Sequence, residues 1–191
     1  MYTPQARINT TVDKLVTSPI FESGNGPHSI TIEKNGTLGN AGNEGRIISI
    51  STNNSDTSTV NLSNKGTING GVYVRNESGF NGTVTVNTFE NTGQVNGYIS
   101  MGAGTSQGTF NIDNFINSGT MQSKSTVVHM TNVKIKTFTN YGLIDNFKNY
   151  SLAHSLAIRD QSTVENFNNI GTIQADSTDS IYRRSKHHKK L

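Results

Sequence analysis

The stretch TVTVNTFENTGQVNGYISMGAGTSQGTFNIDNFINSGTM (residues 83–121) contains one pattern twice. In each copy an apolar residue, Phe89 or Phe115, precedes an Asn by two positions and a Gly by four. A second apolar residue follows the Gly by two positions. Because units repeated at a regular spacing are the sequence signature of solenoid proteins, the extent of this repeat decides the fold.

The pattern recurs six times along the chain. Its core is apolar-x-Asn-x-Gly-x-apolar, and the first copy departs from it by having Lys34 in place of the Asn. The repeated glycines are Gly36, Gly66, Gly93, Gly119, Gly142 and Gly171. The repeated asparagines are Asn64, Asn91, Asn117, Asn140 and Asn169. Successive glycines are 23–30 residues apart, a period typical of one solenoid coil.

A second apolar stretch follows each glycine, so each period contains three short strand segments and three corners. These stretches are residues 46–51, 72–74, 98–101, 127–130, 156–158 and 181–182. Helical repeats need amphipathic patterns and propeller blades need about 40–45 residues, and neither fits these units. The period therefore predicts an all-β fold, a right-handed parallel β-helix of about six coils with three short strands per coil.

The composition agrees with a thin-cored all-β protein. Asn, Thr, Ser and Gly make up 46% of the 191 residues, and Leu, Ile, Val and Phe make up 23%. The second share lies above the roughly 20% below which disorder is expected. The chain has no Cys, so it forms no disulfide and no thiolate metal site. It has no run of 18 apolar residues, so we expect no membrane-spanning helix.

Repeat content and charge divide the chain into three parts. We expect residues 1–29 to be an N-terminal extension or an incomplete first coil, residues 30–182 to form the β-helix, and residues 183–191 to be a basic, disordered tail. The tail holds five of the 16 basic residues, and residues 1–182 hold eleven basic and thirteen acidic side chains. The body therefore predicts no specific nucleic-acid partner. The tail is expected to contact anionic surfaces, or else to be out-of-frame sequence foreign to the repeat.

Stacked coils align equivalent residues in columns. We predict an internal column of Phe89, Phe115, Phe138 and Phe167, continued by Leu62 and Ile32. The repeated asparagines are predicted to bond to one another from coil to coil, with a plain turn role as the alternative. The repeated glycines are predicted to take a positive φ at a corner.

One column carries charge. Six residues before the glycine, four successive coils have Asn87, Asp113, Lys136 and Glu165, at a step of three residues that we interpret as a corner. Alternating signs about 4.8 Å apart attract each other. Exposed pairs contribute at most about 1 kcal/mol, so we interpret this charged column as register support rather than as an active site.

No residue set predicts a catalytic, cofactor-binding or metal site. Of the histidines His28, His129, His154, His187 and His188, only the tail pair has a ligand spacing, and His129 is expected to be an exposed strand residue. Glycan-cleaving enzymes need two carboxylates facing one bond. Asp113 and Glu165 would be about 9.6 Å apart with Lys136 between them, a poor arrangement for that role.

The F-x-N-x-G-x-I unit, as in residues 89–95 and 167–173, resembles the repeats of bacterial autotransporter passenger domains. It is most similar to the family related to the Helicobacter vacuolating cytotoxin and its Campylobacter relatives, over roughly residues 30–173. The resemblance implies a β-helical passenger that a signal peptide and an outer-membrane β-barrel bring to the cell surface. The chain shows neither segment, so we expect it to be a piece of a larger exported precursor.

We expect a non-enzymatic fragment of a secreted or surface-displayed, outer-membrane-associated passenger that acts in adhesion or host contact, as virulence adhesins do. Recognition would lie in the loops 39–45, 75–82 and 102–108, and the partner would be a host-cell surface protein or glycan. Exposed strand edges at the coil ends predict self-association. The alternatives are part of a vacuolating, pore-forming toxin, which would need an apolar, Gly-spaced N-terminal stretch that is lacking here, and a glycan-acting β-helix enzyme.

Overall fold

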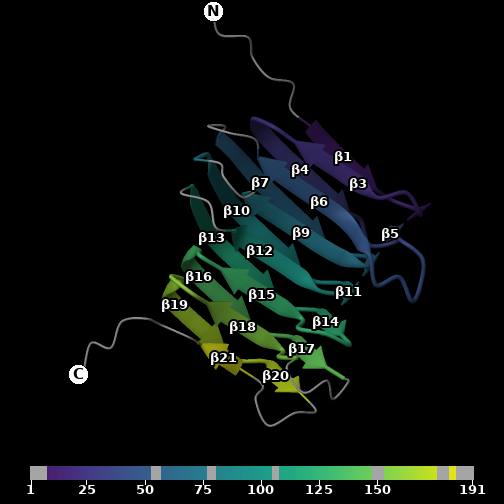
Figure 1. Cartoon of the computed structure of the whole chain (residues 1–191). Coiled ribbons are helices and arrows are strands. Elements are labelled where there is room, and N and C mark those ends of the chain that lie inside the picture. Colours follow the sequence, from purple (N-terminus) through teal and green to yellow (C-terminus); the bar gives the residue numbers. More distant parts are fainter. Residues whose placement is uncertain are drawn as a thin grey trace, which may run out of the picture.

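The computed structural model describes residues 8–52, 57–76, 81–104, 108–147, 153–175 and 181–183, and there it contains strands and no helix (Figure 1). Sheet A consists of β1 (Ile8–Val12), β4 (Gly26–Ile32), β7 (Thr57–Asn64), β10 (Thr83–Asn91), β13 (Thr109–Asn117), β16 (Lys134–Asn140) and β19 (Thr163–Asn169). Sheet B consists of β2 (Leu15–Val16), β5 (Thr37–Leu38), β8 (Thr67–Asn69), β11 (Gln94–Asn96), β14 (Thr120–Ser123), β17 (Leu143–Asn146) and β20 (Thr172–Ala175). Sheet C consists of β3 (Ile20–Ser23), β6 (Arg46–Thr52), β9 (Gly71–Asn76), β12 (Ile99–Ala103), β15 (Val128–Thr131), β18 (Leu156–Arg159) and β21 (Ile181–Arg183).

The three sheets form the parallel β-helix that the repeat predicts. Each coil gives one strand to each sheet in turn, and every strand pairs in parallel with its equivalent in the next coil. The coils follow one another in chain order from β1 at the top of Figure 1 to β21 near its bottom, as the change from purple to yellow shows. The second apolar stretch of every repeat lies in sheet C.

A first coil precedes the first repeat unit. Strands β1, β2 and β3 lie within residues 1–29, where the sequence predicts an extension or an incomplete coil, and they add one strand to each sheet. The repeat pattern misses this coil because Lys14 occupies the place of the glycine, as the pairing of Leu15 with Thr37 shows. Of the predicted tail, only Arg183 lies in a described strand, and residues 184–191 lie outside the described residues.

The interior is a narrow apolar column with a stack of phenylalanine rings. The ring centroids of Phe89, Phe115, Phe138 and Phe167 follow one another at 4.7, 4.9 and 5.1 Å, with planes within 10° of parallel. The first three rings are fully buried, whereas Phe167 in the last full coil is 46% exposed. Leu62 continues the predicted column by pairing with Phe89.

The column then passes to Ile30, and the prediction of Ile32 is wrong. Ile30 pairs with Leu62, and Ile32 pairs with Asn64. The corner between β4 and β5 contains the four residues 33–36, with a turn in which the Gly36 amide donates to the Glu33 carbonyl. The corner between β7 and β8 contains only residues 65–66. Because the first corner is two residues longer, the residue four positions before Gly36 is Ile32, whereas the residue that aligns with Leu62 is Ile30.

The repeated asparagines form a buried ladder. Asn64, Asn91, Asn117 and Asn140 each donate from Nδ2 to Oδ1 of the next asparagine at 2.7–2.8 Å, and the last acceptor is Asn169. Each donating amide also bonds a backbone carbonyl, as Asn117 does to Leu143 O at 3.2 Å. The four donors are fully buried, so the ladder supplies the polar partners that these side chains need.

The repeated glycines do not have a positive φ, contrary to the sequence prediction. Among the described residues, the glycines with positive φ are Gly24, Gly26, Gly39, Gly42, Gly70 and Gly102. A Cβ on Gly93, Gly119, Gly142 or Gly171 would instead overlap the backbone oxygen of the equivalent glycine in the preceding coil. The position needs glycine because the backbones of successive coils touch there.

The charged column lies on a bulge within sheet A, not at a corner between sheets. The register of β10 against β7 shifts between Val86 and Thr88, so Asn87 is an additional residue in the strand. Asp113, Lys136 and Glu165 occupy the same position in β13, β16 and β19. Among the described residues these three side chains form no ion pair within 4.0 Å. Neighbouring amides join the coils there instead, since Asn114 Nδ2 donates to Asn87 O and Asn166 Nδ2 to Lys136 O, both at 3.2 Å.

Candidate functional site

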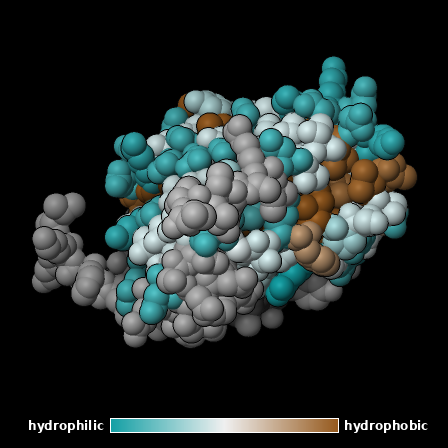
Figure 2. Space-filling model, turned by 90° about the horizontal axis from the view of Figure 1, so that it is seen from above, coloured by the Kyte–Doolittle hydropathy of each residue, from teal (hydrophilic) through white to brown (hydrophobic). Residues whose placement is uncertain are grey.

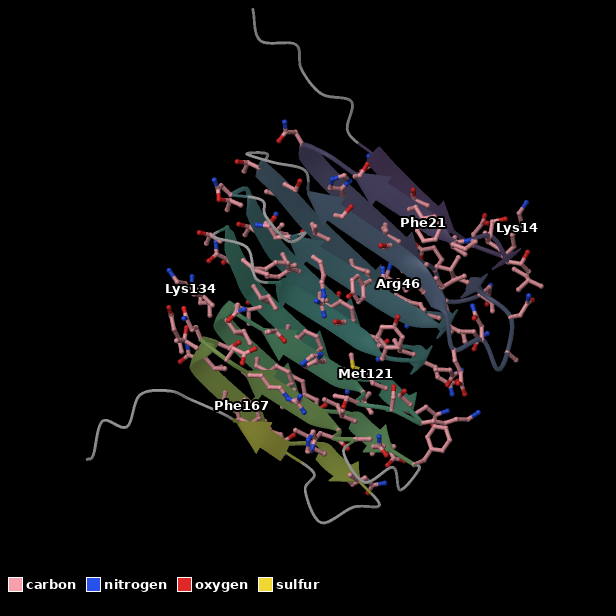
Figure 3. All side chains as sticks on the ribbon, viewed as in Figure 1. Lys14, Phe21, Arg46, Met121, Lys134 and Phe167 are labelled. Atoms are coloured by element: carbon pink, nitrogen blue, oxygen red, sulfur yellow. The ribbon has the colours of Figure 1, made fainter. Side chains whose placement is uncertain are left out.

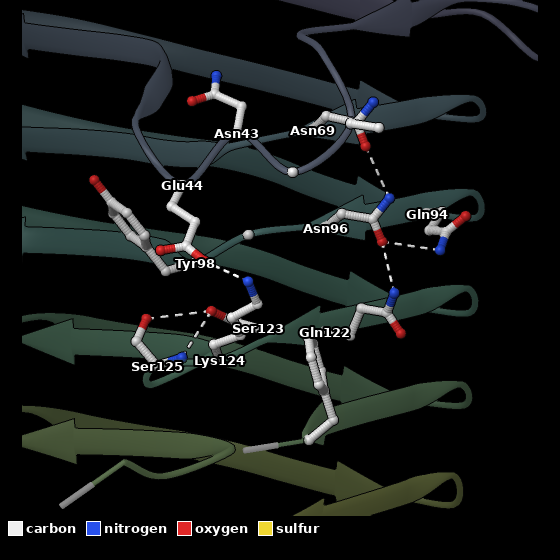
Figure 4. Close-up of a pocket in the computed structure, with 14 residues that line it drawn as sticks. Asn43, Glu44, Asn69, Gln94, Asn96, Tyr98, Gln122, Ser123, Lys124 and Ser125 are labelled. Carbon is white, nitrogen blue, oxygen red and sulfur yellow. Dashed lines mark hydrogen bonds and ion pairs between the residues drawn. The ribbon is translucent and has the colours of Figure 1, made fainter. Parts of the chain in front are cut away.

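A groove of about 540 Å³ lies at the corner where sheet B passes into sheet C (Figure 4). Its lining comes from four successive coils and from the long corner after β5. The lining residues are Ala41, Gly42, Asn43, Glu44, Asn69, Gln94, Asn96, Gly97, Tyr98, Gln122, Ser123, Lys124, Ser125 and Phe147. The volume is that of a small-ligand site.

The wall of the groove is a second ladder of amides. Asn69, Asn96 and Gln122 hold the same register position in β8, β11 and β14. Asn96 Nδ2 donates to Asn69 Oδ1 at 2.9 Å, and Gln122 Nε2 donates to Asn96 Oδ1 at 2.8 Å. Gln94 Nε2 also donates to Asn96 Oδ1 at 2.9 Å. The strands therefore hold the amides of this wall in one row, as Figure 4 shows.

The rim of the groove is the loop that the sequence predicts to carry recognition. Loop 39–45 connects β5 to β6 and contributes Ala41 to Glu44 to the lining. Glu44 Oε1 lies 2.7 Å from Lys124 Nζ, so the loop is tied to the corner three coils away. Asn43 Oδ1 accepts from the amide of Gly45 at 2.9 Å. The other two predicted loops, 75–82 and 102–108, lie partly outside the described residues.

Two aromatic rings add apolar surface to the groove. The ring of Tyr98 lies against the backbone of Gly71, where a Cβ would overlap it. Its centroid is 6.5 Å from that of Tyr73, edge to face, so the groove adjoins the outer face of sheet C. Phe147 lines the groove and is 42% exposed. Rings beside a row of amides suit a ligand with both apolar faces and hydroxyl or amide groups.

The structure does not bring the predicted column residues into this groove. The Phe, Asn and Gly repeats lie in the interior and at the corner between sheets A and B, and the charged column lies on sheet A. Sequence reasoning missed the groove because its residues come from segments 106 positions apart. The one signal was loop 39–45, the longest corner of its coil.

Three of the five histidines, His28, His129 and His154, lie among the described residues. His28 is buried, with Nδ1 2.8 Å from Glu22 Oε2 and Nε2 3.3 Å from Gly24 O. This pair lies inside the first coils, where later coils hold Val60 and Ile50, and the sequence pattern did not reveal it. His187 and His188 lie outside the described residues. No group of three or more His, Cys, Asp or Glu suited to a metal occurs in the described part of the chain.

His129 lies in strand β15 of sheet C, and its side chain is partly exposed. Its Nε2 lies 3.1 Å from Thr131 Oγ1. Burial lowers the pKa of His129 from its ordinary value of 6.5, and the positive charges of Arg159 and Arg75 lower it further. Asp160 acts in the opposite direction. The surroundings of His129 therefore favour its neutral form.

Comparison with protein-family models, with curated proteins and with solved structures finds no match for this chain. In the described part of the chain there is also no helix that is both long and apolar enough to cross a membrane.

Proposed function

We propose that this chain is a non-enzymatic binding module of a secreted or surface-displayed passenger, and that its β-helix serves adhesion or host contact. The observation that carries this proposal is the groove between sheets B and C, with its amide row, its two aromatic rings and loop 39–45 at its rim. Amides that pair with hydroxyls, together with ring faces, suit a host-surface glycan or the polar side chains of a host protein.

The chemistry of the groove favours binding over cleavage. Its lining contains one carboxylate, Glu44, and this group pairs with Lys124. Acid–base cleavage of a glycosidic bond uses two carboxyl groups flanking that bond. Asp113 and Glu165 do not line the groove. The groove thus has the hydrogen-bonding groups of a recognition site without a second acid.

The solenoid gives the groove a stiff support. The strands that carry Asn69, Asn96 and Gln122 are joined to their neighbours by parallel pairing, and the buried Asn ladder joins the same coils in sheet A. Sites on regular strands keep their geometry better than sites on loops alone. The surface location rests on the resemblance of residues 30–173 to passenger repeats, which implies export as part of a longer precursor.

The test is a steric block of the groove. Ala41 is exposed at the rim, and its methyl side chain makes no hydrogen bond. Ala41→Trp therefore adds an indole there and removes no side-chain hydrogen bond. The control is Asn35→Trp, at an exposed turn on the corner between sheets A and B of the same coil. Binding of the labelled full chain to cultured host cells and to an array of neutral glycans is measured for both.

We expect Ala41→Trp to weaken binding at least tenfold and Asn35→Trp to leave it unchanged. Equal binding by the wild type and by Ala41→Trp would show that the groove is not the recognition site. Absence of any binding by the wild-type chain to cells and array would remove the adhesion proposal itself.

A further inference from the structure

Every arginine whose side chain is described lies on the outer face of sheet C. Arg46 is in β6, Arg75 in β9 and Arg159 in β18, so the fold gathers residues up to 113 positions apart on one face. The lysines with described side chains lie at corners or on sheet A: Lys14, Lys34, Lys65, Lys124, Lys134 and Lys136. Figure 3 shows Arg46 over the strands within the body of the view and Lys134 at the left edge of the molecule.

Two of these arginines are held against one tyrosine. The Cζ atom of Arg46 is 3.7 Å from the ring centroid of Tyr73, and that of Arg75 is 4.5 Å from it. Arg75 Nη2 also donates to Ser100 Oγ at 2.9 Å. A guanidinium that rests on a ring loses little conformational freedom when it binds an anion, so this pair is arranged in advance for such a ligand.

Two arginines of this face, Arg46 and Arg75, have no acidic partner within 4.0 Å among the described residues. In β3, β6, β9, β12, β15 and β18 the outward positions contain no acid. Besides Arg46 they are Phe21, Ser23, Ser49, Ser51, Tyr73, Arg75, Ser100, Gly102, His129, Thr131, Ala157 and Arg159, of which Ser100, Gly102 and Ala157 are buried. Asp160 follows at the end of β18. The lowering of the His129 pKa by Arg159 and Arg75 reports the same positive field.

The spacing of the arginines suits a polymer with sparse charge. From β6 to β18 is four strand spacings, about 19 Å, and this length contains three arginines. The hydroxyl groups of Ser49, Ser51 and Thr131 are partly exposed on this face and can bond to sugar hydroxyls, whereas Ser100 is buried and accepts from Arg75. Double-stranded DNA carries one charge per about 1.7 Å, which three arginines on a body with excess acid neutralise poorly.

We propose that the outer face of sheet C binds an acidic polysaccharide, with Arg46 and Arg75 pairing with its carboxylate or sulfate groups. A planar guanidinium binds either group through two parallel hydrogen bonds. This site adjoins the groove where Tyr73 contacts Tyr98, but Arg46, Arg75 and Tyr73 do not line the groove, and the proposal does not depend on the function proposed for it. Exposed Phe21, two strands from Tyr73 on the same face, offers a ring to the sugar backbone.

The test uses the full chain and two immobilised probes, heparin for sulfate and polygalacturonate for carboxylate. The variant Arg46→Gln/Arg75→Gln removes both charges, and Lys34→Gln/Lys134→Gln removes the same charge from other faces as the matched control. We expect the arginine variant to bind at least one probe tenfold more weakly or worse, and the control to bind as the wild type does. The preferred probe identifies the anionic group.

Further variants keep the result unambiguous. If the glutamine variant does not fold, Arg46→Lys/Arg75→Lys keeps the charge but loses the planar fork, and it should also bind more weakly than the wild type. The proposal is overturned if the arginine variant binds like the wild type, or if the lysine control loses as much. It is also overturned if replacing the five basic tail residues by Gln abolishes all binding, or if single-stranded DNA binds as tightly as both polysaccharides at equal salt. The proposal is likewise overturned if the wild-type chain binds neither heparin nor polygalacturonate.

Discussion

The glycine at the corner between sheets A and B is required by contact between neighbouring coils. Its own φ is ordinary, so any L residue could adopt the local backbone. What excludes a side chain is the carbonyl of the preceding coil, which lies where a Cβ would be. A backbone oxygen cannot rotate away as a flexible side chain can, so the whole corner would have to move.

Gly119→Ala should therefore destabilise the protein strongly. A Cβ at this position would overlap the Gly93 oxygen, and we expect a loss of about 3 kcal/mol, the upper end of the usual range for overpacking. Urea unfolding followed by circular dichroism measures the change. Gly45→Ala is the control, because its Cβ would only meet the Asn43 side chain at 3.2 Å. Equal midpoints for the two variants would contradict the contact argument.

His129 makes stability depend on pH. Since the folded state lowers its pKa below 6.5, the unfolded chain binds the proton more readily. Its contribution to stability is therefore complete above pH 6.5 and is lost as the pH falls below that value. Between pH 7.5 and 5.5 the urea midpoint of the wild type should fall more than that of His129→Gln, because other titrating groups act equally in both. Parallel falls in the two proteins would argue against this role.

At the scale of the element, the strands of sheet A are joined by a side-chain ladder as well as by their backbones. The ladder begins at Asn64, whose Oδ1 is buried and has no hydrogen-bond partner in the described structure. The reason is that Ile32 holds the neighbouring position in β4. The ladder and the phenylalanine stack therefore join only the later coils. The first two coils are joined by other contacts, including the Glu22–His28 pair.

The ladder predicts that interior and terminal asparagines differ in energy. Asn117→Ala removes one donor and one acceptor from a fully buried row and leaves Asn140 Oδ1 without its donor, which should cost about 3 kcal/mol. Asn169→Ala removes one acceptor at an exposed end and should cost about 1 kcal/mol or less. Denaturant unfolding of both variants provides the comparison. A cost for Asn169→Ala as large as that for Asn117→Ala would rule out the ladder as the source.

At the scale of the whole molecule, the described coils form a stack with two ends. In sheet A the outermost strands are β1 and β19, and each has one described neighbour. The interior opens at the last coil, where Phe167 is 46% exposed although the stacked ring of Phe138 is fully buried, and Ile170 beside it is 68% exposed. Figure 2 views the molecule from its N-terminal side, and hydrophobic residues are visible there among hydrophilic ones.

We therefore expect concentration-dependent self-association of the isolated chain through its coil ends. Ile170→Lys places a charge beside the edge strand β19 and should shift sedimentation toward the monomer. Tyr141→Lys is the control, at an exposed corner one coil away from that end. A wild type that sediments as a monomer at every concentration would refute the expectation.

Much of the fold could be predicted because each repeat unit carries its own local signal. Phe89, Asn91 and Gly93 hold their spacing in every later unit, and the columns they predict are present. The prediction failed where the spacing changes, at the longer corner after Ile32 and at Lys14 in the first coil. The reason for the glycine was also wrong, since a contact between coils leaves the same sequence pattern as a positive φ does.

The sequence by itself determined the β-helix, the phenylalanine stack and the Asn ladder, because stacking equal coils needs the same residue at the same place in each one. Only the tertiary structure decided what lies on the outside. The glycine spacing varies from 23 to 30 residues because the corners differ in length. Outward residues that align in space are therefore not a constant number of residues apart in the sequence. That alignment brings loop 39–45 over the amide row and places Arg46 and Arg75 on one tyrosine, which no spacing in the chain predicts.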